Sequence, residues 1–469
     1  MITGLTDILA PPLLASKSTL YLAELEARRD SPFPVGVVGI GRMGRGIVDQ
    51  IATMVGMRVM AAADLEVERA LRAFTENGWS REQVCETEVL SEAADALKAG
   101  RPIATADPLL VPQLDIEAVV EATGDPGTGA QVAAAAIRQR RHTVMLNVEA
   151  DAVVGPLLAE RARRAGVVYT LASGDQPGAI FEMVEWARTL GFEIVCAGRG
   201  TVLFPGDHHA TPETYAEMAL RNRMNPKMYN EFRDGTKAQL EMVAVSNVLQ
   251  MAPARRGMHE PFCKWPDLGK VFALRQDGGL LERPGVVDMA NAVDEQGRYV
   301  HEDKVFPGVF VVVTSPHSGV RSVMASLFEP GFGGTPQQHG PNWGLFRPYH
   351  LAAVEVPMSV ARALVQGRPT GELKGAPVAE LITVAKRDLR PGEQLDGGGG
   401  YTVYGLSERA DTARAENLLP FGFAYSGRLR NAVKRDQPLT WADVEVDESS
   451  ELYRMRQEQA RIFGKRPSR

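Results

Sequence analysis

The feature that most constrains the fold of this chain is a glycine-rich turn that follows an apolar run. The run Val35–Ile40 has the character of a strand buried on both faces, and the residues after the turn, to about Val55, can form a helix. Glycines spaced Gly-x-Gly-x-x-Gly between a strand and a helix let a pyrophosphate approach the helix N-terminus, which predicts a dinucleotide-binding turn. Cofactor contact is expected from Gly39, Gly41, Arg42, Met43 and Gly44.

Strand and helix patterns continue to alternate as far as residue 173. Further strands are expected at Met57–Ala63, Asp115–Glu121, Thr143–Asn147 and Gly166–Leu171. Helices are expected at 66–77, 127–140 and 152–165. Strands separated by helices in this way are typical of right-handed βαβ units. The predicted fold class is therefore α/β, with a Rossmann-type doubly wound parallel sheet over residues 34–173.

Polar residues follow the predicted strands at the ends where the ligand crevice of a doubly wound sheet lies. Asp64 follows the second strand, where a carboxylate accepts hydrogen bonds from a ribose and repels a 2′-phosphate. It favours NAD over NADP, although the nearby arginines at 69 and 72 keep NADP open. Thr123 and Gly124 are expected at the nicotinamide ribose, a role compatible with a simple helix-capping turn, and Asn147 is a further cofactor candidate.

Two carboxylates come directly after the strand expected at Thr143–Asn147. Glu149 and Asp151 should face the same crevice, where they could hold a divalent cation or a substrate hydroxyl. An equally acceptable interpretation is that Asp151 caps a helix beginning at Ala152. That alternative does not explain Glu149.

A segment that is apolar on nearly all sides begins at Lys237, which predicts a buried helix. Lys237 and Glu241 lie one turn apart on it. An exposed pair of this kind contributes only ~0.2–0.5 kcal/mol, but a buried ammonium and carboxylate are costly unless they are paired or used. We therefore expect Lys237 to act as acid/base at a substrate carbonyl, with Glu241 beside it.

Histidines in loops supply weaker candidates. His259 and His350 are expected to reach the substrate, although loop histidines are often ordinary surface residues. The adjacent pair His208–His209 is a poor metal site, because neighbouring residues on an extended loop point apart. The sequence contains no Gly-x-Ser-x-Gly elbow, Walker loop or His-Glu-x-x-His motif.

The chain of 469 residues predicts about three domains. After the doubly wound sheet we expect an α+β substrate domain and then a small unit of short strands and Gly/Pro turns. A helical arm, with a helix at 16–29, precedes them and a charged tail follows. The expected boundaries are 1–33, 34–173, 174–368, 376–447 and 448–469.

Composition excludes several classes of protein. A net charge of −6 gives no general attraction to nucleic acid or anionic membranes. No apolar run reaches the roughly 20 residues of a membrane helix, and the N-terminus lacks the pattern of a secretory signal. Three dispersed cysteines exclude a disulfide scaffold and a thiolate zinc site. We expect a cytoplasmic protein with a small-molecule substrate and no nucleic-acid or membrane partner.

With these residues in view, the chain from about Pro34 to Asp447 resembles the deoxyxylulose-phosphate-reductoisomerase-like (DRL) oxidoreductases, also described as homoserine-dehydrogenase-like proteins with a C-terminal SAF domain. The resemblance rests on Val35–Gly44, Asn147–Asp151, Gly174–Gly178, Asn225-Pro226 with Asp234–Lys237, and Arg347–His350. Three further segments resemble an SAF module: Ala385–Glu393, Gly400–Gly405 and Leu418–Pro420.

The resemblance implies NAD(P)-dependent hydride transfer on a small hydroxy-carbonyl or sugar-derived substrate, with isomerisation coupled to it in the namesake reaction. It also implies that residues 174–368 form a catalytic domain that makes a homodimer. Lys237 matches the proton-shuttling lysine of homoserine-dehydrogenase-like sites, and Asp234 in the same motif joins it as a catalytic candidate. Glu149, Asp151 and Glu241 could imitate the metal-binding acids of the similar reductoisomerases.

Two departures from the family pattern bear on the substrate. Gly198-Arg199-Gly-Thr201 stands where a lysine-rich segment is expected, so Arg199, with Arg347, is the cation offered to the substrate. Asp64 fits poorly with NADPH. Both favour a different, unphosphorylated sugar-derived substrate. The alternatives are a homoserine or sugar-acid dehydrogenase, a dinucleotide-binding sensor with an SAF interaction module, and a carbohydrate-binding or lyase role for the SAF segment.

Overall fold

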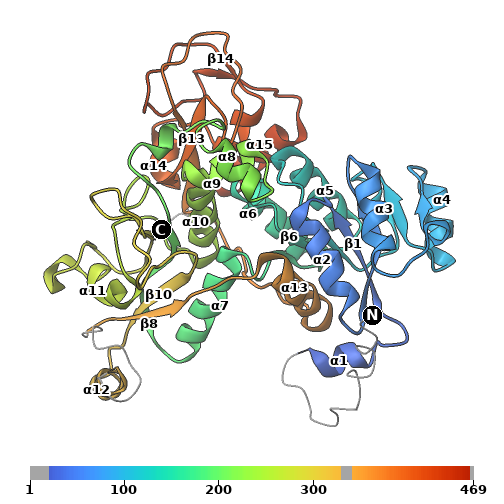
Figure 1. Ribbon diagram of the computed structural model, residues 1–469, viewed down its shortest axis with the longest axis horizontal. Coiled ribbons are helices and arrows are strands. Elements are labelled where there is room, and N and C mark those ends of the chain that lie inside the picture. Colours follow the sequence, from blue (N-terminus) through green and yellow to red (C-terminus); the bar gives the residue numbers. More distant parts are fainter. Residues whose placement is uncertain (1–20, 329–340, 465–469) are drawn as a thin grey trace.

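The first part of the molecule is a seven-stranded parallel sheet with helices on both faces (Figure 1). The computed structural model describes residues 21–328 and 341–464. The strand order is β3-β4-β2-β1-β5-β6-β7, so the order reverses between β1 and β5, and a ligand crevice is expected at the carboxyl ends of those two strands. The predicted α/β class with a doubly wound sheet is confirmed.

The elements of this parallel-sheet part follow one another as strand, helix, strand. Its strands are β1 (Phe33–Val38), β2 (Met57–Ala63), β3 (Cys85–Glu86), β4 (Ile103–Thr105), β5 (Ala118–Glu121), β6 (His142–Met145) and β7 (Tyr169–Leu171). Its helices are α2 (Arg42–Ala52), α3 (Val67–Thr75), α4 (Leu90–Lys98), α5 (Pro126–Arg138) and α6 (Val148–Ala165).

Several predicted boundaries in this part were wrong. The prediction missed β3, β4 and α4, because strands of two and three residues give no periodic pattern. Helix α6 begins at Val148 rather than Ala152, and its N-cap is Asn147, whose side chain accepts a hydrogen bond from the Ala150 amide. Asp151 therefore lies inside the helix and does not cap it.

The second part is a four-stranded mixed sheet in the order β11-β10-β8-β9. Helices α7 and α10 cover one face of it, and the other face packs on a separate apolar cluster that contains the stacked rings of Phe272 and Phe310. Its strands are β8 (Glu193–Thr201), β9 (Val286–Asn291), β10 (Val309–Thr314) and β11 (Trp343–Arg347). Its helices are α7 (Gln176–Thr189), α8 (Ala216–Arg221), α9 (Pro226–Arg233), α10 (Thr236–Leu249), α11 (Leu268–Val271) and α12 (Ser318–Leu327).

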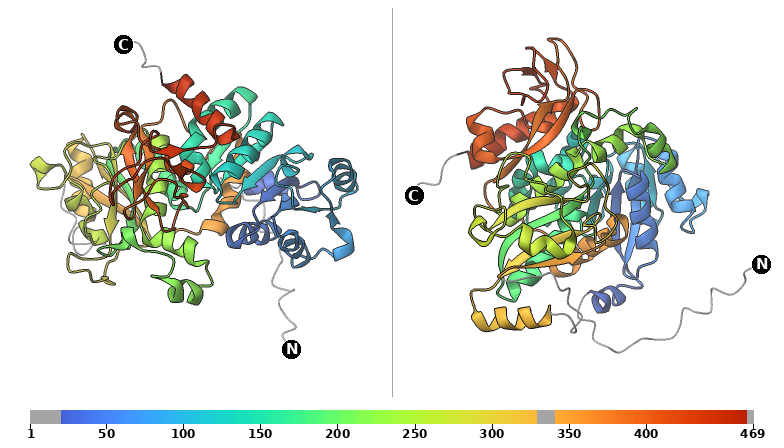
Figure 2. Two further views of the ribbon diagram at one scale, coloured as in Figure 1. Left: turned by 90° about the horizontal axis from the view of Figure 1, so that it is seen from above. Right: turned by 60° about the vertical axis from the view of Figure 1, so that its left-hand side comes forward.

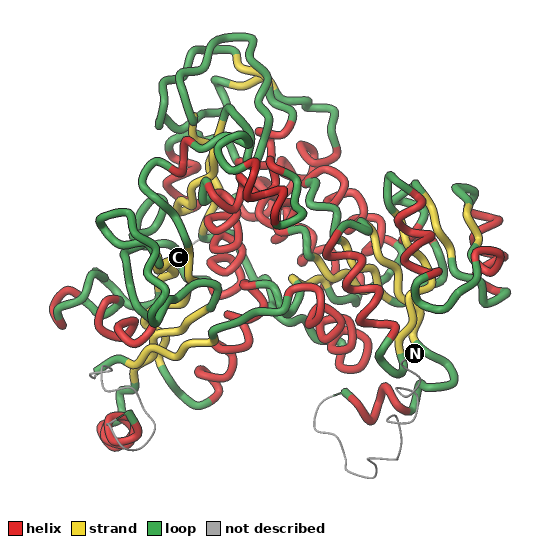
Figure 3. Tube along the Cα trace, viewed as in Figure 1, coloured by secondary structure: helices red, strands yellow, loops and turns green. Residues whose placement is uncertain are grey.

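The third part, the C-terminal β part, consists mostly of loops around short strands, as Figure 3 shows at the top of the molecule. It sits on α10: the amide of Gly405 donates to Oγ1 of Thr236 at 3.0 Å, and the amide of Ser407 donates to Oε1 of Gln239 at 2.9 Å. Its elements are β12 (Ala379–Ala385), β13 (Val403–Arg409), α14 (Ala410–Ala415), β14 (Arg428–Leu429) and β15 (Val444–Glu445).

Two later helices return to the parallel-sheet part. Helix α13 (Ala352–Gln366) packs on α2, with Val356 and Val360 fully buried in the same cluster as Ile47. Helix α15 (Glu451–Phe463) lies along α5 and α6, and Figure 2 shows it in red beside their teal ribbons. The expected segments 174–368 and 448–469 thus each contain a helix that also packs on the parallel-sheet part.

At the N-terminus, helix α1 (Leu22–Glu26) is the described portion of the helix expected at 16–29, and residues 16–20 lie outside the described residues. The three cysteines are free thiols. Among the described residues, no helix is both long and apolar enough to cross a membrane.

Candidate active site

The three glycines of the turn have different structural reasons to be glycine. Gly39 has φ +89°, the left-handed region that favours glycine. A Cβ on Gly44 would lie 1.8 Å from the carbonyl oxygen of Gly39, so the helix can pack against the turn only without a side chain there. Gly41, the N-cap of α2, faces open space, and Arg42 and Met43 beside it are exposed. This geometry leaves the N-terminus of α2 open to an anionic group.

Asp64 lies against this turn at the end of β2. Its Oδ2 accepts a hydrogen bond from the Ile40 amide at 2.8 Å, and its Oδ1 accepts one from the Glu66 amide at 2.9 Å. Arg69 is 3.6 Å away, the nearest cation. The carboxylate is thus fixed at the carboxyl end of β2, beside the glycine-rich turn.

The ends of β5 and β6 are tied together by a partly buried network of hydrogen bonds. Asn147 donates from Nδ2 to Oγ1 of Thr123 at 3.2 Å and to the carbonyl of Asp125 at 2.9 Å. Thr123 in turn donates from its amide to Glu121 at 3.0 Å. Burial raises the pKa of Glu121 to about 7, although hydrogen bonds from Thr123 oppose that shift. Glu121 was not predicted as a site residue, because a carboxylate that ends an apolar run looks like the polar end of the strand. Gly124, with φ +74°, faces open space beside this network.

Lys237 and Glu149 form the centre of the candidate catalytic site. Nζ of Lys237 lies 2.6 Å from Oε1 of Glu149, and the two side chains are only 16% and 8% exposed. Burial alone would lower the pKa of Lys237, but the surrounding carboxylates of Glu149, Glu241, Glu231 and Asp175 raise it well above its usual value. The ammonium form of Lys237 is thus strongly favoured.

Glu241 does not pair with Lys237, contrary to the expectation from their spacing. Its carboxylate contacts the guanidinium of Arg199 on β8, and both side chains are almost fully buried. Burial raises the pKa of Glu241 to about 7 even though Arg199 opposes it. Two neighbouring ion pairs, rather than one along the helix, therefore line the N-terminal half of α10.

A further carboxylate, Glu231 on α9, completes the cluster and was not predicted. Burial raises its pKa to about 8, the charge of Glu149 adds to the shift, and Lys237 opposes it. Oε1 of Glu231 and Oε2 of Glu149 are buried without a hydrogen-bond partner among the described residues. Nothing in the local sequence marks Glu231, because α9 has no apolar face that would indicate which of its side chains are buried: Met228 and Phe232 are exposed.

His350 and Arg347 come close to the same site from β11 and the loop after it. Nδ1 of His350 lies 3.0 Å from the carbonyl of Pro307. Burial lowers the pKa of His350, the charge of Asp175 opposes this, and Arg199 reinforces it, which places the ring near both residues. Arg347 lies 2.5 Å from Glu355 and 3.4 Å from Glu182.

Other predicted site residues serve different contacts. Asp234, a predicted catalytic candidate, is fully buried in an ion pair of 2.7 Å with Lys386 and so links α9 to the C-terminal β part. His208 and His209 lie against Tyr404 of that part and share no ligand geometry. His259 lies at the edge of β9, where its Nδ1 is 2.6 Å from the buried carboxylate of Asp288.

The expected metal set is not assembled in this structure. Glu149 pairs with Lys237 and Glu241 with Arg199, while Asp151 accepts a hydrogen bond of 2.9 Å from Tyr169 deep inside the protein. Burial raises the pKa of Asp151 to about 7. Over residues 21–328 and 341–464, no group of three His, Cys, Asp or Glu side chains is arranged to hold a metal ion.

Comparison with known proteins identifies the segment that carries most of this cluster. Residues 174–356 match the family model for the catalytic domain of oxidoreductase DRL. The protein is an oxidoreductase. Lys237, Glu241, Arg199 and His350 lie in the DRL-type segment, whereas Glu149 lies outside it. The match covers less than half of the chain and ends before the C-terminal β part.

Solved structures with a similar arrangement are dehydrogenases and a reductoisomerase. A probable dehydrogenase from Thermotoga maritima is 12% identical, with 72% of this chain and 90% of that chain covered and a TM-score of 0.38. A myo-inositol dehydrogenase from Corynebacterium glutamicum is 13% identical over the same shares, with a TM-score of 0.38. The 1-deoxy-D-xylulose 5-phosphate reductoisomerase from Zymomonas mobilis, in complex with NADPH, is 14% identical, with shares of 72% and 84% and a TM-score of 0.36. At these values no substrate is carried over to this chain. No curated protein matches the sequence significantly.

Proposed function

We propose that this oxidoreductase is NAD(P)-dependent and transfers a hydride between the nicotinamide and a small hydroxy-carbonyl or sugar-derived substrate. The observation that supports this most directly is the N-terminus of α6. Its cap, Asn147, bonds to Thr123 at the cofactor end of β5, and Glu149, two residues on, pairs with Lys237. One helix end thus joins the expected nicotinamide side of the crevice to the buried lysine.

The proposed chemistry follows from the charge states around Lys237. The bound nicotinamide would supply or accept the hydride at the substrate carbon. In the reduction direction, the Lys237 ammonium donates a proton to the carbonyl oxygen as negative charge develops there. Glu231 and Glu241, with pKa values of about 8 and 7, are able to return a proton to Lys237 near neutral pH. Oxidation follows the same path in reverse.

Substrate contact is proposed for Arg199, His350, Arg347 and His259. Arg199 and Arg347 already bind carboxylates of the chain, so an anionic substrate group would have to compete with Glu241 or Glu355. A hydroxyl or carbonyl group needs no such exchange. This supports the unphosphorylated, sugar-derived class, with homoserine or a sugar acid as the alternative.

The preference for NAD over NADP is proposed from Asp64. A carboxylate placed to bind a ribose repels a 2′-phosphate, whereas Arg69, 3.6 Å from it, is the residue that would bind one. We expect NADH to bind more tightly than NADPH, and Asp64→Ser to narrow the difference or reverse it. Tight NADPH binding with negligible NADH binding in the unaltered protein would refute this assignment.

The remaining parts of the family resemblance are proposed with it: an SAF-like module at 376–447 and a homodimer formed through residues 174–368. Turnover is to be tested by nicotinamide absorbance at neutral pH, with sugar phosphates, sugar acids and homoserine, both cofactors, and Mg²⁺ present or absent. Cofactor binding without turnover of any substrate would favour the sensor alternative.

A further inference from the structure

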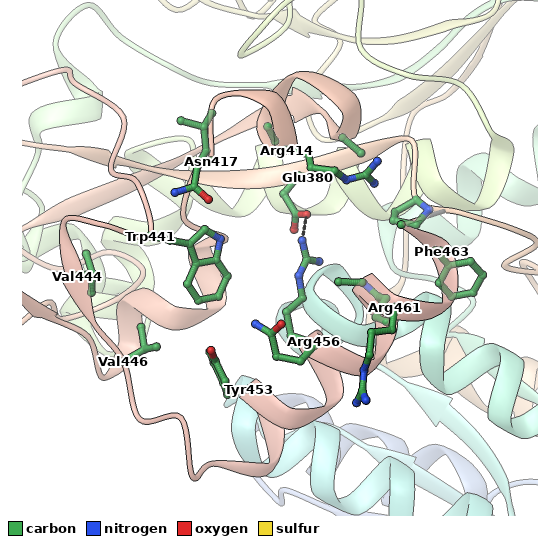
Figure 4. A pocket seen from close by; sticks show the side chains of 18 of the residues that line it. Glu380, Arg414, Asn417, Trp441, Val444, Val446, Tyr453, Arg456, Arg461 and Phe463 are labelled. Carbon is green, nitrogen blue, oxygen red and sulfur yellow. Dashed lines mark hydrogen bonds and ion pairs between the residues drawn. The ribbon is translucent and has the colours of Figure 1, made fainter. Parts of the chain in front are cut away.

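A cavity in the described structure lies between the C-terminal β part and helix α15 (Figure 4). Its volume is about 870 Å³, within the range of roughly 300–1,000 Å³ that is usual for small-molecule sites. None of the residues assigned above to cofactor, catalysis or substrate lines it. A ligand bound here would therefore be distinct from the substrate of the proposed reaction.

The charge of the cavity wall is opposite to that of the chain as a whole. Four arginines and two glutamates line it, while the chain carries a net charge of −6. Glu380 is neutralised by an ion pair with Arg456, and this pair is largely buried. Arg414, Arg430 and Arg461 are exposed at the wall, and none of them has a carboxylate within ion-pair distance among the described residues.

Aromatic side chains stand beside two of the four arginines of the wall, Arg456 and Arg461. Figure 4 shows Trp441 and Tyr453 on one side of Arg456, and Phe463 with Arg461 on the other. Trp441 and Tyr453 meet edge to face with ring centroids 6.1 Å apart. Aromatic faces beside arginines can hold a flat apolar group while the guanidinium groups hold an anion.

We propose that this cavity is a second ligand site, for a small organic anion with a planar or aromatic body. Arg414 and Arg461 bind the anionic group, a carboxylate or a phosphate, and Trp441, Tyr453 and Phe463 contact the flat part. The wall supplies both halves of this recognition from two different segments of the chain, the C-terminal β part and α15. A simple inorganic anion would use only the arginines, and a neutral ring only the aromatic side chains.

The test uses the full-length protein and the fluorescent probe 1-anilinonaphthalene-8-sulfonate, an aromatic anion of this kind. We expect saturable binding that benzoate or phenyl phosphate displaces and that benzyl alcohol and inorganic phosphate at equal concentration do not. Displacement by only one of the two aromatic anions would identify the anionic group. The double variant Arg414→Gln/Arg461→Gln should bind the probe at least about tenfold more weakly, a loss near 1.4 kcal/mol.

The matched control is Arg390→Gln, which removes an exposed arginine of the same part of the chain that does not line the cavity. It should bind the probe like the unaltered protein, and thermal melting should show that all variants are folded. Equal binding by the double variant and the control would overturn the proposal. So would absence of probe binding, or a wild-type dimer that the double variant converts to monomer, since a second copy would then cover the cavity.

Discussion

At the scale of single residues, the candidate active site contains more carboxylates than cationic side chains. Lys237 faces four of them, and its pKa is raised far above its usual value despite burial. The sequence analysis predicted Lys237 as a proton shuttle from its spacing to Glu241. The structure instead pairs it with Glu149 from another part of the fold, so a free amine near neutral pH is disfavoured. Lys237 is therefore held as the ammonium, the form that can donate a proton, while the same carboxylates make it a weaker acid.

Replacing Lys237 should therefore slow the chemical step and leave the affinity for the cofactor unchanged. We expect Lys237→Met to lower kcat by about 10²- to 10⁴-fold, the usual contribution of a general acid, because methionine has no proton to donate. Lys237→Arg should retain part of the activity, since the charge and a donor remain. Steady-state kinetics with a substrate from the panel, and NADH titration of each variant, check both points. Unchanged kcat in Lys237→Met would refute the role.

The raised pKa of Glu231 predicts how the stability of the protein depends on pH. Its folded pKa of about 8 lies above its usual value of 4.5, because burial disfavours the charged form. The folded state therefore binds more protons than the unfolded state between these values, and this group's contribution to stability is lost as the pH rises through about 8. Glu231→Gln should match the wild type at pH 5 and be more stable at pH 8.5. A stability difference that does not change with pH would contradict this.

At the scale of elements, α6 depends on a helix that lies 306 positions away in sequence. Pro156 lies inside α6 and has no N–H to donate to the preceding turn. Around it, the amide of Leu157 donates to Oε1 of Gln459 at 3.1 Å, and Nε2 of Gln459 donates to the carbonyl of Val153 at 3.0 Å. One buried amide side chain of α15 thus satisfies both kinds of backbone group beside the proline.

Removing this amide should destabilise the protein. Gln459→Leu would leave the Leu157 amide without its side-chain acceptor, at a cost of about 1–3 kcal/mol, while the Val153 carbonyl would keep its second donor, Nη1 of Arg456 at 3.2 Å. Gln459→Glu should also destabilise the protein, because its second oxygen would face the Val153 carbonyl, acceptor against acceptor, at a position that is only 2% exposed. Urea unfolding measures both, with Gln457→Leu, an exposed position on the same helix, as control. A loss in the control as large as in Gln459→Leu would argue against the specific contact.

Local signals account for the parts of the fold that the sequence analysis predicted. The apolar strand, the glycines and the following helix of β1 and α2 are adjacent in sequence, and their pattern needs no distant contact. Asp64, Thr123 and Asn147 were placed because strand ends of a parallel sheet meet at one edge. Glu231 could not be placed this way, because its burial depends on packing beside Glu149 and on Gly398, where a Cβ would meet its carboxylate.

At the scale of the whole molecule, the expected domain boundaries divide the chain into continuous segments, whereas the packing joins segments that are far apart in sequence. Helices α13 and α15 both contribute to the parallel-sheet part, and Val356 and Val360 are as fully buried there as Ile47. Neither helix has a sequence pattern that indicates which distant element it packs against. Their apolar faces indicate burial, but not against which sheet.

A truncation tests this arrangement. A chain that ends at Asp447 loses α15 and should unfold at lower temperature, with weaker NADH binding, because α6 carries Asn147 and Glu149. A chain that ends at Gly464 keeps the whole helix and should behave like the full sequence. Thermal melting and NADH titration compare the two. Equal melting temperatures would show that α15 does not stabilise the parallel-sheet part.

The contact between Gln459 and α6 also has a consequence for synthesis on the ribosome. Val153 and Leu157 leave the exit tunnel early, but the side chain that satisfies them is made 306 residues after Val153. At about 5–20 residues per second, this delay is on the order of 15–60 s. During that time the nascent chain exposes an α6 whose backbone groups beside Pro156 lack this partner. The parallel-sheet part is therefore synthesised first but is among the last parts to complete its packing. A chaperone would bind the nascent chain at the side of α6 that α15 later covers.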